Sequence, residues 1–236
     1  MTAPLPAVAC GGIPLLREMF LVAVNTSPDA RLFGFVNGDL LLGAGLRDTV
    51  RRVLEDPVAE REPVLLLLRR LNLPFAEAFH VSDLDTVERL KARATKVPHG
   101  SSDAFITNRL FPWRRIPEVV PGRPGIGMWL VAAARALGVT VIDLTNTVTV
   151  LHMTSSAGNL ESHKLGNPSC NVQLYRRLGL MPSSWLCGHI DCAGLTSVSV
   201  GGDDATRVTL QSKADSRVSL PIFCHDCRLD TKRLLQ

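Results

Sequence analysis

Short apolar runs alternate with amphipathic segments over roughly the first 180 residues of the chain, and this alternation limits the folds that it can adopt. Segments with the length and the apolar or β-branched content of strands lie at residues 31–42 (interrupted at 37–39), 63–68, 104–107, 140–143 and 147–152. Segments with apolar residues at helical spacing lie at 13–25, 46–55, 82–96, 128–137 and 171–178. The order predicts an α/β fold with a mainly parallel central sheet flanked by helices.

The C-terminal part of the sequence has a different pattern. Residues 196–200, 207–211 and 217–222 alternate apolar and polar side chains, with polar turns between them, as antiparallel strands do. We therefore expect two units, an α/β domain over residues 1–182 and a small, cysteine-containing β-rich appendage over residues 183–236.

Composition argues against two classes of partner. The net charge is +4, but the basic residues are not clustered and there is only one tyrosine, whereas nucleic-acid surfaces combine clustered cations with stacking aromatics. The longest apolar runs are far shorter than a bilayer requires. We expect no nucleic-acid partner and no membrane span.

The first nine residues lack a charged segment followed by a long apolar one, so they do not resemble a signal peptide. We expect a cytoplasmic protein as the chain stands, and the secretory pathway if a longer N-terminal anchor precedes it.

The tripeptide Asn37-Gly38-Asp39 follows an apolar strand segment. Ligands bind beside the carboxyl ends of strands in open α/β sheets, and a carboxylate there can hold Mg²⁺ or Mn²⁺ against a diphosphate. The alternative is a simple turn, for which Asn, Gly and Asp are all suited.

Two further segments could contact a ligand. Residues 122–129 place Arg123 in a glycine-rich loop before a helix, where it could pair with a phosphate or could be a surface side chain of a helix-entry loop. His152 ends an apolar strand segment and could be a metal ligand, a phosphate contact or a structural histidine.

Five of the six cysteines follow residue 169. Two pairs, Cys187 with Cys192 and Cys224 with Cys227, have spacings that a tetrahedral zinc site accepts. Structural zinc, free or redox-active thiols and disulfides all remain open from the spacing.

Taken in order, several blocks resemble the GT-A-type glycosyltransferase-like family of nucleotide-diphospho-sugar transferases, over about residues 10–179. The blocks that carry the resemblance are Pro14-Leu15-Leu16, Phe35-Val36-Asn37-Gly38-Asp39-Leu40, Arg69-Arg70-Leu71-Asn72-Leu73, Ser101-Ser102-Asp103-Ala104-Phe105, Gly122-Arg123-Pro124-Gly125 with Trp129-Leu130, Val141-Ile142-Asp143-Leu144-Thr145 and Val148 to His152.

The resemblance implies a nucleotide-sugar partner, an unidentified acceptor, and a Mn²⁺ or Mg²⁺ cofactor. It implies metal binding by Asp39 and His152 and a catalytic role for Asp103. The donor and its phosphates are expected to contact Asn37, Asp39, Arg70 and Arg123.

The chain departs from the family pattern in three places. Gly127-Met128 stands where the family has Asp-Asn before the tryptophan, Ala104 replaces a tyrosine, and the first strand-helix unit of the family has no counterpart. These departures indicate either a truncated form of the protein or a degenerate enzyme that has lost transfer activity and kept the fold. The competing hypothesis is a non-catalytic interaction or scaffold domain with a zinc-stapled or thiol-rich C-terminal tail.

Overall fold

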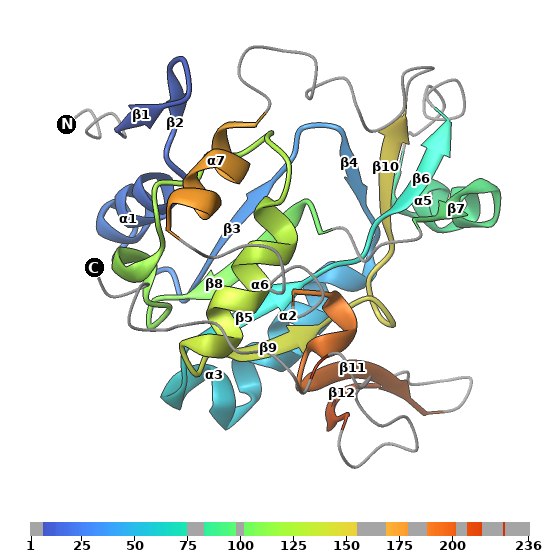
Figure 1. Cartoon of the computed structure of the whole chain (residues 1–236). Coiled ribbons are helices and arrows are strands. Elements are labelled where there is room, and N and C mark those ends of the chain that lie inside the picture. Colours follow the sequence, from blue (N-terminus) through green and yellow to red (C-terminus); the bar gives the residue numbers. More distant parts are fainter. Residues whose placement is uncertain are drawn as a thin grey trace.

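The computed structural model of the chain describes residues 7–74, 83–97, 102–154, 169–178, 188–201, 207–213 and 224 (Figure 1). Its helices are α1 (Leu16–Thr26), α2 (Gly45–Glu55), α3 (Pro57–Arg61), α5 (Leu84–Leu90), α6 (Ile126–Ala136) and α7 (Cys170–Arg177). Its strands are β1 (Val8–Ala9), β2 (Ile13–Pro14), β3 (Leu32–Val36), β4 (Leu40–Leu42), β5 (Val64–Leu67), β6 (Leu71–Pro74), β7 (Thr95–Lys96), β8 (Ala104–Asn108), β9 (Thr140–Asp143), β10 (Val150–Thr154), β11 (Leu195–Val200) and β12 (Arg207–Ser212). Among its 3₁₀ turns are η1 (Lys91–Arg93), η2 (Trp113–Arg115) and η5 (Ile190–Cys192).

The main sheet has six strands in the order β12-β11-β9-β5-β8-β3. Strand β9 is parallel to β5 and β11, whereas β8 is antiparallel to both β3 and β5, and β12 is antiparallel to β11. The fold is therefore α/β, as expected, but the prediction of a mainly parallel sheet was wrong. An apolar run such as residues 104–107 has the same composition in either direction, so its sequence does not reveal that β8 runs against its neighbours.

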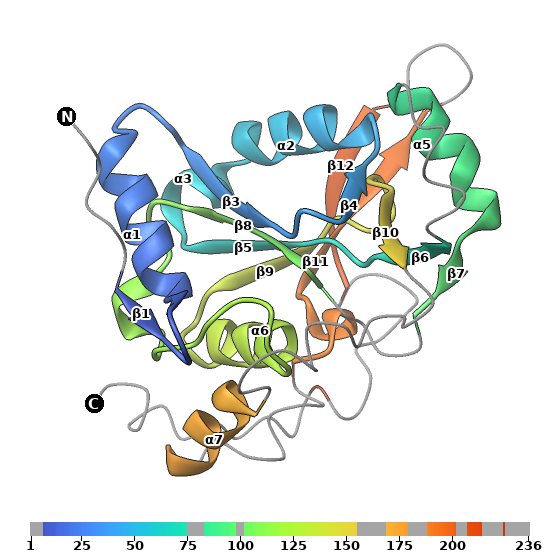
Figure 2. The ribbon, with the colours of Figure 1, turned by 90° about the horizontal axis from the view of Figure 1, so that it is seen from above.

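A second sheet, β4-β10-β6-β7, lies at the other end of the molecule from α1 (Figures 1 and 2). Strand β10 is parallel to β6 and antiparallel to β4. The interruption at residues 37–39 is thus the point where the chain passes from the main sheet into the second one. Strand β6 was not anticipated, because its four residues do not show an apolar alternation long enough to stand out.

Helices cover both faces of the main sheet, with α2 on one face and α6 and α7 on the other (Figure 2). Strand β5 shows why both faces must be covered, because all four of its residues are buried. Leu65 and Leu67 pack in the cluster that contains α6, while Val64 and Leu66 pack in the cluster that contains Val53 of α2. Successive side chains of a strand point to opposite faces, so one continuous apolar run contributes to two cores.

Two helix ends agree with their sequence signals, whereas the helix expected over residues 82–96 already ends at Leu90. Asp83 caps α5 by accepting a hydrogen bond from the Thr86 amide, and Gly138 after α6 has a φ of 72°, which suits glycine. Leu84 is 56% exposed, since it occupies the first position of α5, whereas Val87 and Leu90 reach the core. The expected strand at 217–222 lies outside the described residues.

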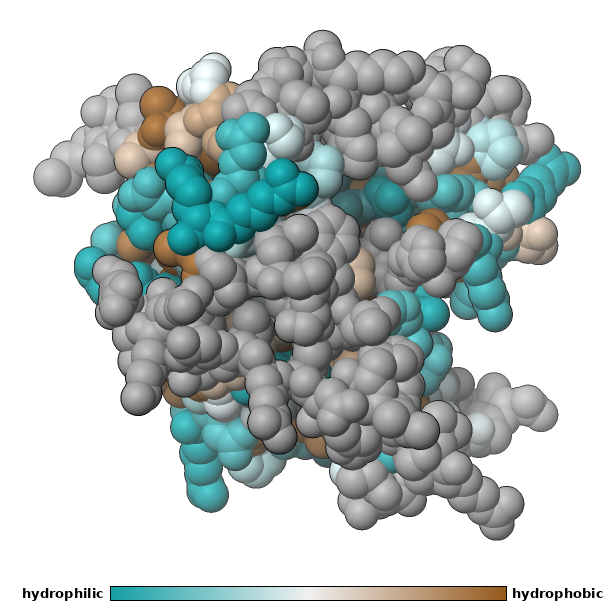
Figure 3. Space-filling model, viewed as in Figure 1, coloured by the Kyte–Doolittle hydropathy of each residue, from teal (hydrophilic) through white to brown (hydrophobic). Residues whose placement is uncertain are grey.

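The β11–β12 hairpin continues the main sheet beside β9, although it belongs to the range expected as an appendage. Hydrophilic side chains gather over α7, α3 and α5 on the face seen in Figure 3. In the described part of the chain, no helix is both long and apolar enough to cross a membrane.

Candidate functional site

Topology brings three distant segments to one edge of the main sheet. Because β3 and β5 both run antiparallel to β8, their carboxyl ends lie beside the start of β8, where Val36 pairs with Ala104 and Leu67 with Phe105. Residues 37–39, residues 68–70 and Asp103 therefore meet at this edge. Strand β10 adds His152 from the second sheet, where it pairs with Leu40.

Four of the side chains predicted from sequence meet here, and we call Asp39, Arg70, Asp103 and His152 the four-residue cluster. His152 Nε2 lies 3.0 Å from Asp39 Oδ2, and the Arg70 guanidinium donates to the Asp103 carboxylate. His152 and Arg70 are buried, whereas the Asp39 side chain is 49% exposed. The cluster therefore combines a buried interior with an opening at Asp39.

The environment of the cluster shifts two pKa values. Burial lowers the pKa of His152, and Arg70 lowers it further, against the opposing effects of Asp39 and Asp103. Burial also raises the pKa of Asp103 despite the attraction of Arg70 and His152, with Asp39 adding to the rise. His152 is therefore a neutral imidazole at neutral pH, the form in which histidine binds metals.

The geometry of the cluster bears on the divalent cation expected at Asp39 and His152. Two adjacent ligands of an octahedral cation, each bound at about 2.1 Å, are about 3.0 Å apart. The separation of His152 Nε2 and Asp39 Oδ2 agrees with this geometry. Arg70 compensates Asp103, which leaves the Asp39 carboxylate as the uncompensated charge of the cluster. These two residues therefore fit Mn²⁺ or Mg²⁺.

Within residues 7–224 as far as they are described, no group of three or more His, Cys, Asp or Glu side chains could hold a metal ion. Two protein ligands agree with the usual mode of Mg²⁺, which takes one or two carboxylates from the protein and the rest from phosphates and water. Such a site depends on its substrate to complete the coordination.

Two predicted donor contacts behave differently. The backbone N–H of Asn37 donates to the backbone carbonyl of Asp103, and the backbone carbonyl of Asn37 accepts from the backbone N–H of Leu40. The backbone of Asn37 therefore shapes the turn. Arg123 donates to the Gly122 carbonyl, and its own carbonyl accepts from Asn171. No recorded contact joins the described side chain of Arg123 to the four-residue cluster.

The packing of α6 explains why residue 127 is a glycine. A Cβ atom on Gly127 would lie 2.8 Å from the Ser102 carbonyl oxygen, directly beside Asp103. The start of α6 therefore approaches the backbone next to the cluster so closely that a side chain at residue 127 would require the backbone to shift.

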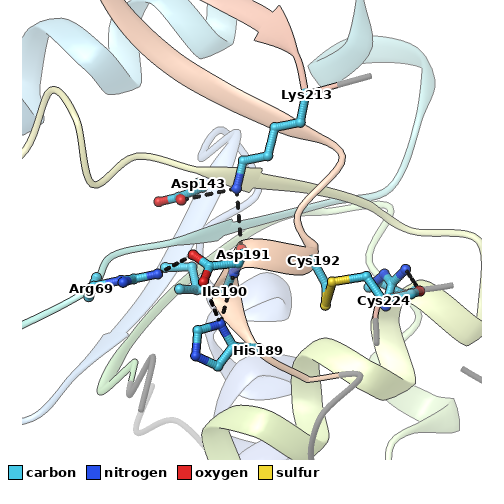
Figure 4. Close-up of a disulfide and its surroundings, with 9 residues drawn as sticks. Arg69, Asp143, His189, Ile190, Asp191, Cys192, Lys213 and Cys224 are labelled. Carbon is cyan, nitrogen blue, oxygen red and sulfur yellow. Dashed lines mark hydrogen bonds and ion pairs between the residues drawn. A yellow bond between two sulfur atoms is a disulfide. The ribbon is translucent and has the colours of Figure 1, made fainter. Parts of the chain in front are cut away.

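The C-terminal cysteines are only partly described. Cys192 and Cys224 form a buried disulfide with their Cα atoms 5.3 Å apart, while Cys187 and Cys227 lie outside the described residues (Figure 4). Oxidised sulfurs cannot bind zinc as thiolates, so a four-cysteine zinc site is not formed in this state. Of the three alternatives left by the spacing, the structure has the disulfide for this pair.

Charged residues next to this disulfide form a second network (Figure 4). Arg69 pairs with Asp191, which also lies 3.0 Å from His189, and Lys213 Nζ lies 3.2 Å from the Asp143 carboxylate. The two consecutive arginines after β5 thus bind aspartates from different segments, Arg69 in this network and Arg70 in the four-residue cluster.

Sequence reasoning missed Asn72 as a site residue and missed the disulfide between Cys10 and Cys170. Asn72 pairs with His152 in the parallel β6–β10 ladder, so it lies beside the cluster. Its position two residues after Arg70 was a possible signal, but without β6 there was no reason to place it at the site.

The comparisons with known proteins leave the family undetermined. No family model matches the chain, and no curated protein or solved structure matches it either.

Proposed function

We propose that the protein binds a nucleotide sugar through a divalent cation and transfers the sugar to an acceptor. The observation that carries the proposal is the four-residue cluster, because Asp39, Arg70, Asp103 and His152 come from four separate segments and meet at the carboxyl ends of β3 and β5. This edge is where open α/β sheets bind ligands.

Asp39 and His152 would hold the cation, which supplies charge neutralisation for a departing nucleoside diphosphate. Arg70 lies on the same edge and carries the positive charge that a phosphate oxygen would attract. If a phosphate draws Arg70 away, Asp103 loses its counter-ion while it stays buried. A carboxylate in that state is suited to take the proton from an acceptor hydroxyl.

A second candidate function is binding without transfer, in a scaffold or interaction domain. The observation that favours it is the contact between α6 and Ser102, which excludes a carboxylate side chain at Gly127. A chain with this packing keeps the cation ligands and loses a polar group next to Asp103.

Isothermal titration calorimetry tests the proposal with UDP-sugars and GDP-sugars in the presence of Mn²⁺. We expect saturable binding that requires Mn²⁺ and is lost in Asp39→Asn and His152→Gln. Asp48→Asn, on an exposed residue of α2, is the matched control and should bind as the unmodified protein does. A folded protein that gives no heat with any of these donors refutes the proposal.

Release of free nucleoside diphosphate separates the two candidate functions. Donor binding with release of the diphosphate, lost in Asp103→Asn, supports transfer. Donor binding without release, in the presence of a broad set of acceptor sugars and peptides, supports the binding domain.

A further inference from the structure

A pocket of about 510 Å³ lies at the edge of the main sheet opposite the four-residue cluster. Its wall includes residues 139–141 at the start of β9 and Glu62, which precedes β5. Strands β5 and β9 are parallel, so both begin at this edge and end at the other, where Leu67 pairs with Asp143. At about 3.3 Å per residue, β5 separates the two edges by about 10 Å. The pocket is therefore distinct from the four-residue cluster.

The lining of the pocket combines apolar side chains with two opposite charges, those of Glu62 and Arg135. Its apolar lining residues are Val58, Val139, Val141, Cys192 and Leu195. Val139, Val141 and Cys192 are each at most 5% exposed, so they form a floor that water hardly reaches. Small-molecule sites usually enclose about 300–1,000 Å³ and place a few polar groups in an apolar wall. The volume and the lining of this pocket agree with that description.

The Arg135 side chain is held at the end of α6. One of its terminal nitrogens donates to the Cys224 backbone carbonyl at 2.8 Å, and Cys224 is joined by a disulfide to Cys192 of the pocket wall. A guanidinium carries enough N–H donors to bond a carboxylate in addition to this carbonyl. Burial lowers the pKa of Arg135, because its charge is partly removed from water. An anionic group in the pocket therefore interacts with Arg135 more strongly than it would in bulk water.

The Glu62 residue is fixed by hydrogen bonds from two other segments. Its carboxylate accepts from the Thr140 hydroxyl, and its backbone carbonyl accepts from the Asn108 side chain. A carboxylate can accept several hydrogen bonds, so it can bind an ammonium group while it keeps Thr140. Glu62 is exposed, unlike the floor of the pocket, so water weakens this second interaction.

We propose that this pocket binds a small zwitterion with an apolar body, of the class of apolar amino acids and dipeptides. Arg135 bonds the carboxylate, Glu62 bonds the ammonium group, and the apolar body contacts the floor. A simple anion is repelled by Glu62 and a simple cation by Arg135, so the two charges favour a ligand that carries both. Binding here uses neither Asp39 nor His152, so the inference does not depend on the proposed function.

Nuclear magnetic resonance titration of the ¹⁵N-labelled full chain tests the inference with leucine and with leucyl-leucine. We expect saturable shifts of the backbone amide signals of Thr140 and Gly194, which line the pocket. N-acetyl-leucyl-leucine lacks the ammonium charge and should bind about 2–5-fold more weakly than leucyl-leucine. Leucyl-leucinamide lacks the carboxylate and should bind about 10–100-fold more weakly. These ligands share one apolar body and need no variant, so they decide the question even if a variant does not fold.

Two variants assign the charges to residues. Arg135→Met should weaken the binding of leucyl-leucine about 10–100-fold, and Glu62→Gln about 2–5-fold. In Glu62→Gln the acetylated and free dipeptides should bind with similar affinity, because the group that distinguishes them is gone. Arg51→Met and Glu60→Gln are the matched controls, since these side chains are 57% and 66% exposed, and both variants should bind as the unmodified protein does.

An absence of shifts at Thr140 and Gly194 with both leucine and leucyl-leucine overturns the inference, and so do shifts confined to the four-residue cluster. Equal affinity for the free, acetylated and amidated dipeptides also overturns it, because the two charges would then take no part in binding. Each of these outcomes leaves the proposed function standing. A protein that binds leucyl-leucine as expected and binds no nucleotide sugar supports this inference and refutes the proposed function.

Discussion

The buried ion pair between Arg70 and Asp103 predicts a specific pattern of stability changes. The side chains are 9% and 20% exposed, so removing either partner leaves an uncompensated charge in a largely dry environment. Such losses cost about 3–5 kcal/mol, whereas replacing both partners by apolar residues of similar size is often neutral. We expect Arg70→Met and Asp103→Leu each to lower the free energy of unfolding by about 3–5 kcal/mol. The double variant should lose much less than the sum.

Urea denaturation followed by circular dichroism measures these values in a double-mutant cycle. For a chain of this length, the single variants should melt about 6–20 °C lower than the unmodified protein. Arg51→Met is the control, because Arg51 and Asp48 form a pair whose side chains are 57% and 67% exposed, and its loss should cost below about 1 kcal/mol. Single variants that cost as little as this control, or costs that add within about 0.5 kcal/mol, would refute the reasoning.

Three other predictions concern stability. Asn108 is 3% exposed; it accepts a hydrogen bond from the Val64 amide and donates two to backbone carbonyl oxygens. Asn108→Ala should therefore lower the free energy of unfolding, measured in urea, by about 2–4 kcal/mol. A loss below about 1 kcal/mol would contradict this. The raised pKa of Asp103 means that the folded chain holds its proton more tightly than the unfolded chain. That contribution to stability is present below about pH 4 and is lost as the pH rises through the pKa of Asp103 in the folded chain. Over this range the free energy of unfolding of Asp103→Asn should therefore rise relative to that of the unmodified protein, measured by urea titrations at a series of pH values. A difference that stays constant with pH would show that the pKa of Asp103 does not change on folding. The Cys10–Cys170 disulfide spans 160 residues and the Cys192–Cys224 disulfide spans 32. Chain entropy therefore predicts that the free energy of unfolding, measured in urea without reductant, falls by about 5 kcal/mol in Cys10→Ser and by about 4 kcal/mol in Cys192→Ser. The reversed order would indicate that strain or residual structure dominates.

The strands and helices of the core were predictable because apolar spacing records them directly. The run at 63–68 became β5, and the alanine-rich segment before Gly138 became α6. Strand direction was not predictable, because the β8 segment carries no signal that distinguishes a parallel from an antiparallel neighbour. The second sheet was missed for a related reason, since its strands are short and its pairings connect residues far apart in the chain.

At the candidate site, side-chain type and position at strand ends were sufficient to select Asp39 and His152. The resemblance supplied Arg70 and Asp103, and the structure brings all four together. Arg123 shows the limit of the same reasoning. A basic residue in a glycine-rich loop has the right chemistry, but the helix that follows the loop decides where the loop lies, and here Arg123 bonds its own neighbour Gly122.

The consecutive arginines after β5 have a consequence for how the chain tolerates changes in length. Arg69 bonds Asp191 and Arg70 bonds Asp103, and adjacent residues of an extended chain point to opposite sides. Deleting Leu68, the one residue between β5 and Arg69, would exchange the sides that the two arginines face, so each would approach the other's partner from the wrong direction. The net charge would be unchanged, yet both ion pairs would be lost. Inserting one residue after Leu68 would exchange the sides in the same way, whereas inserting two would keep the alternation, so this segment should accept added residues in steps of two rather than one.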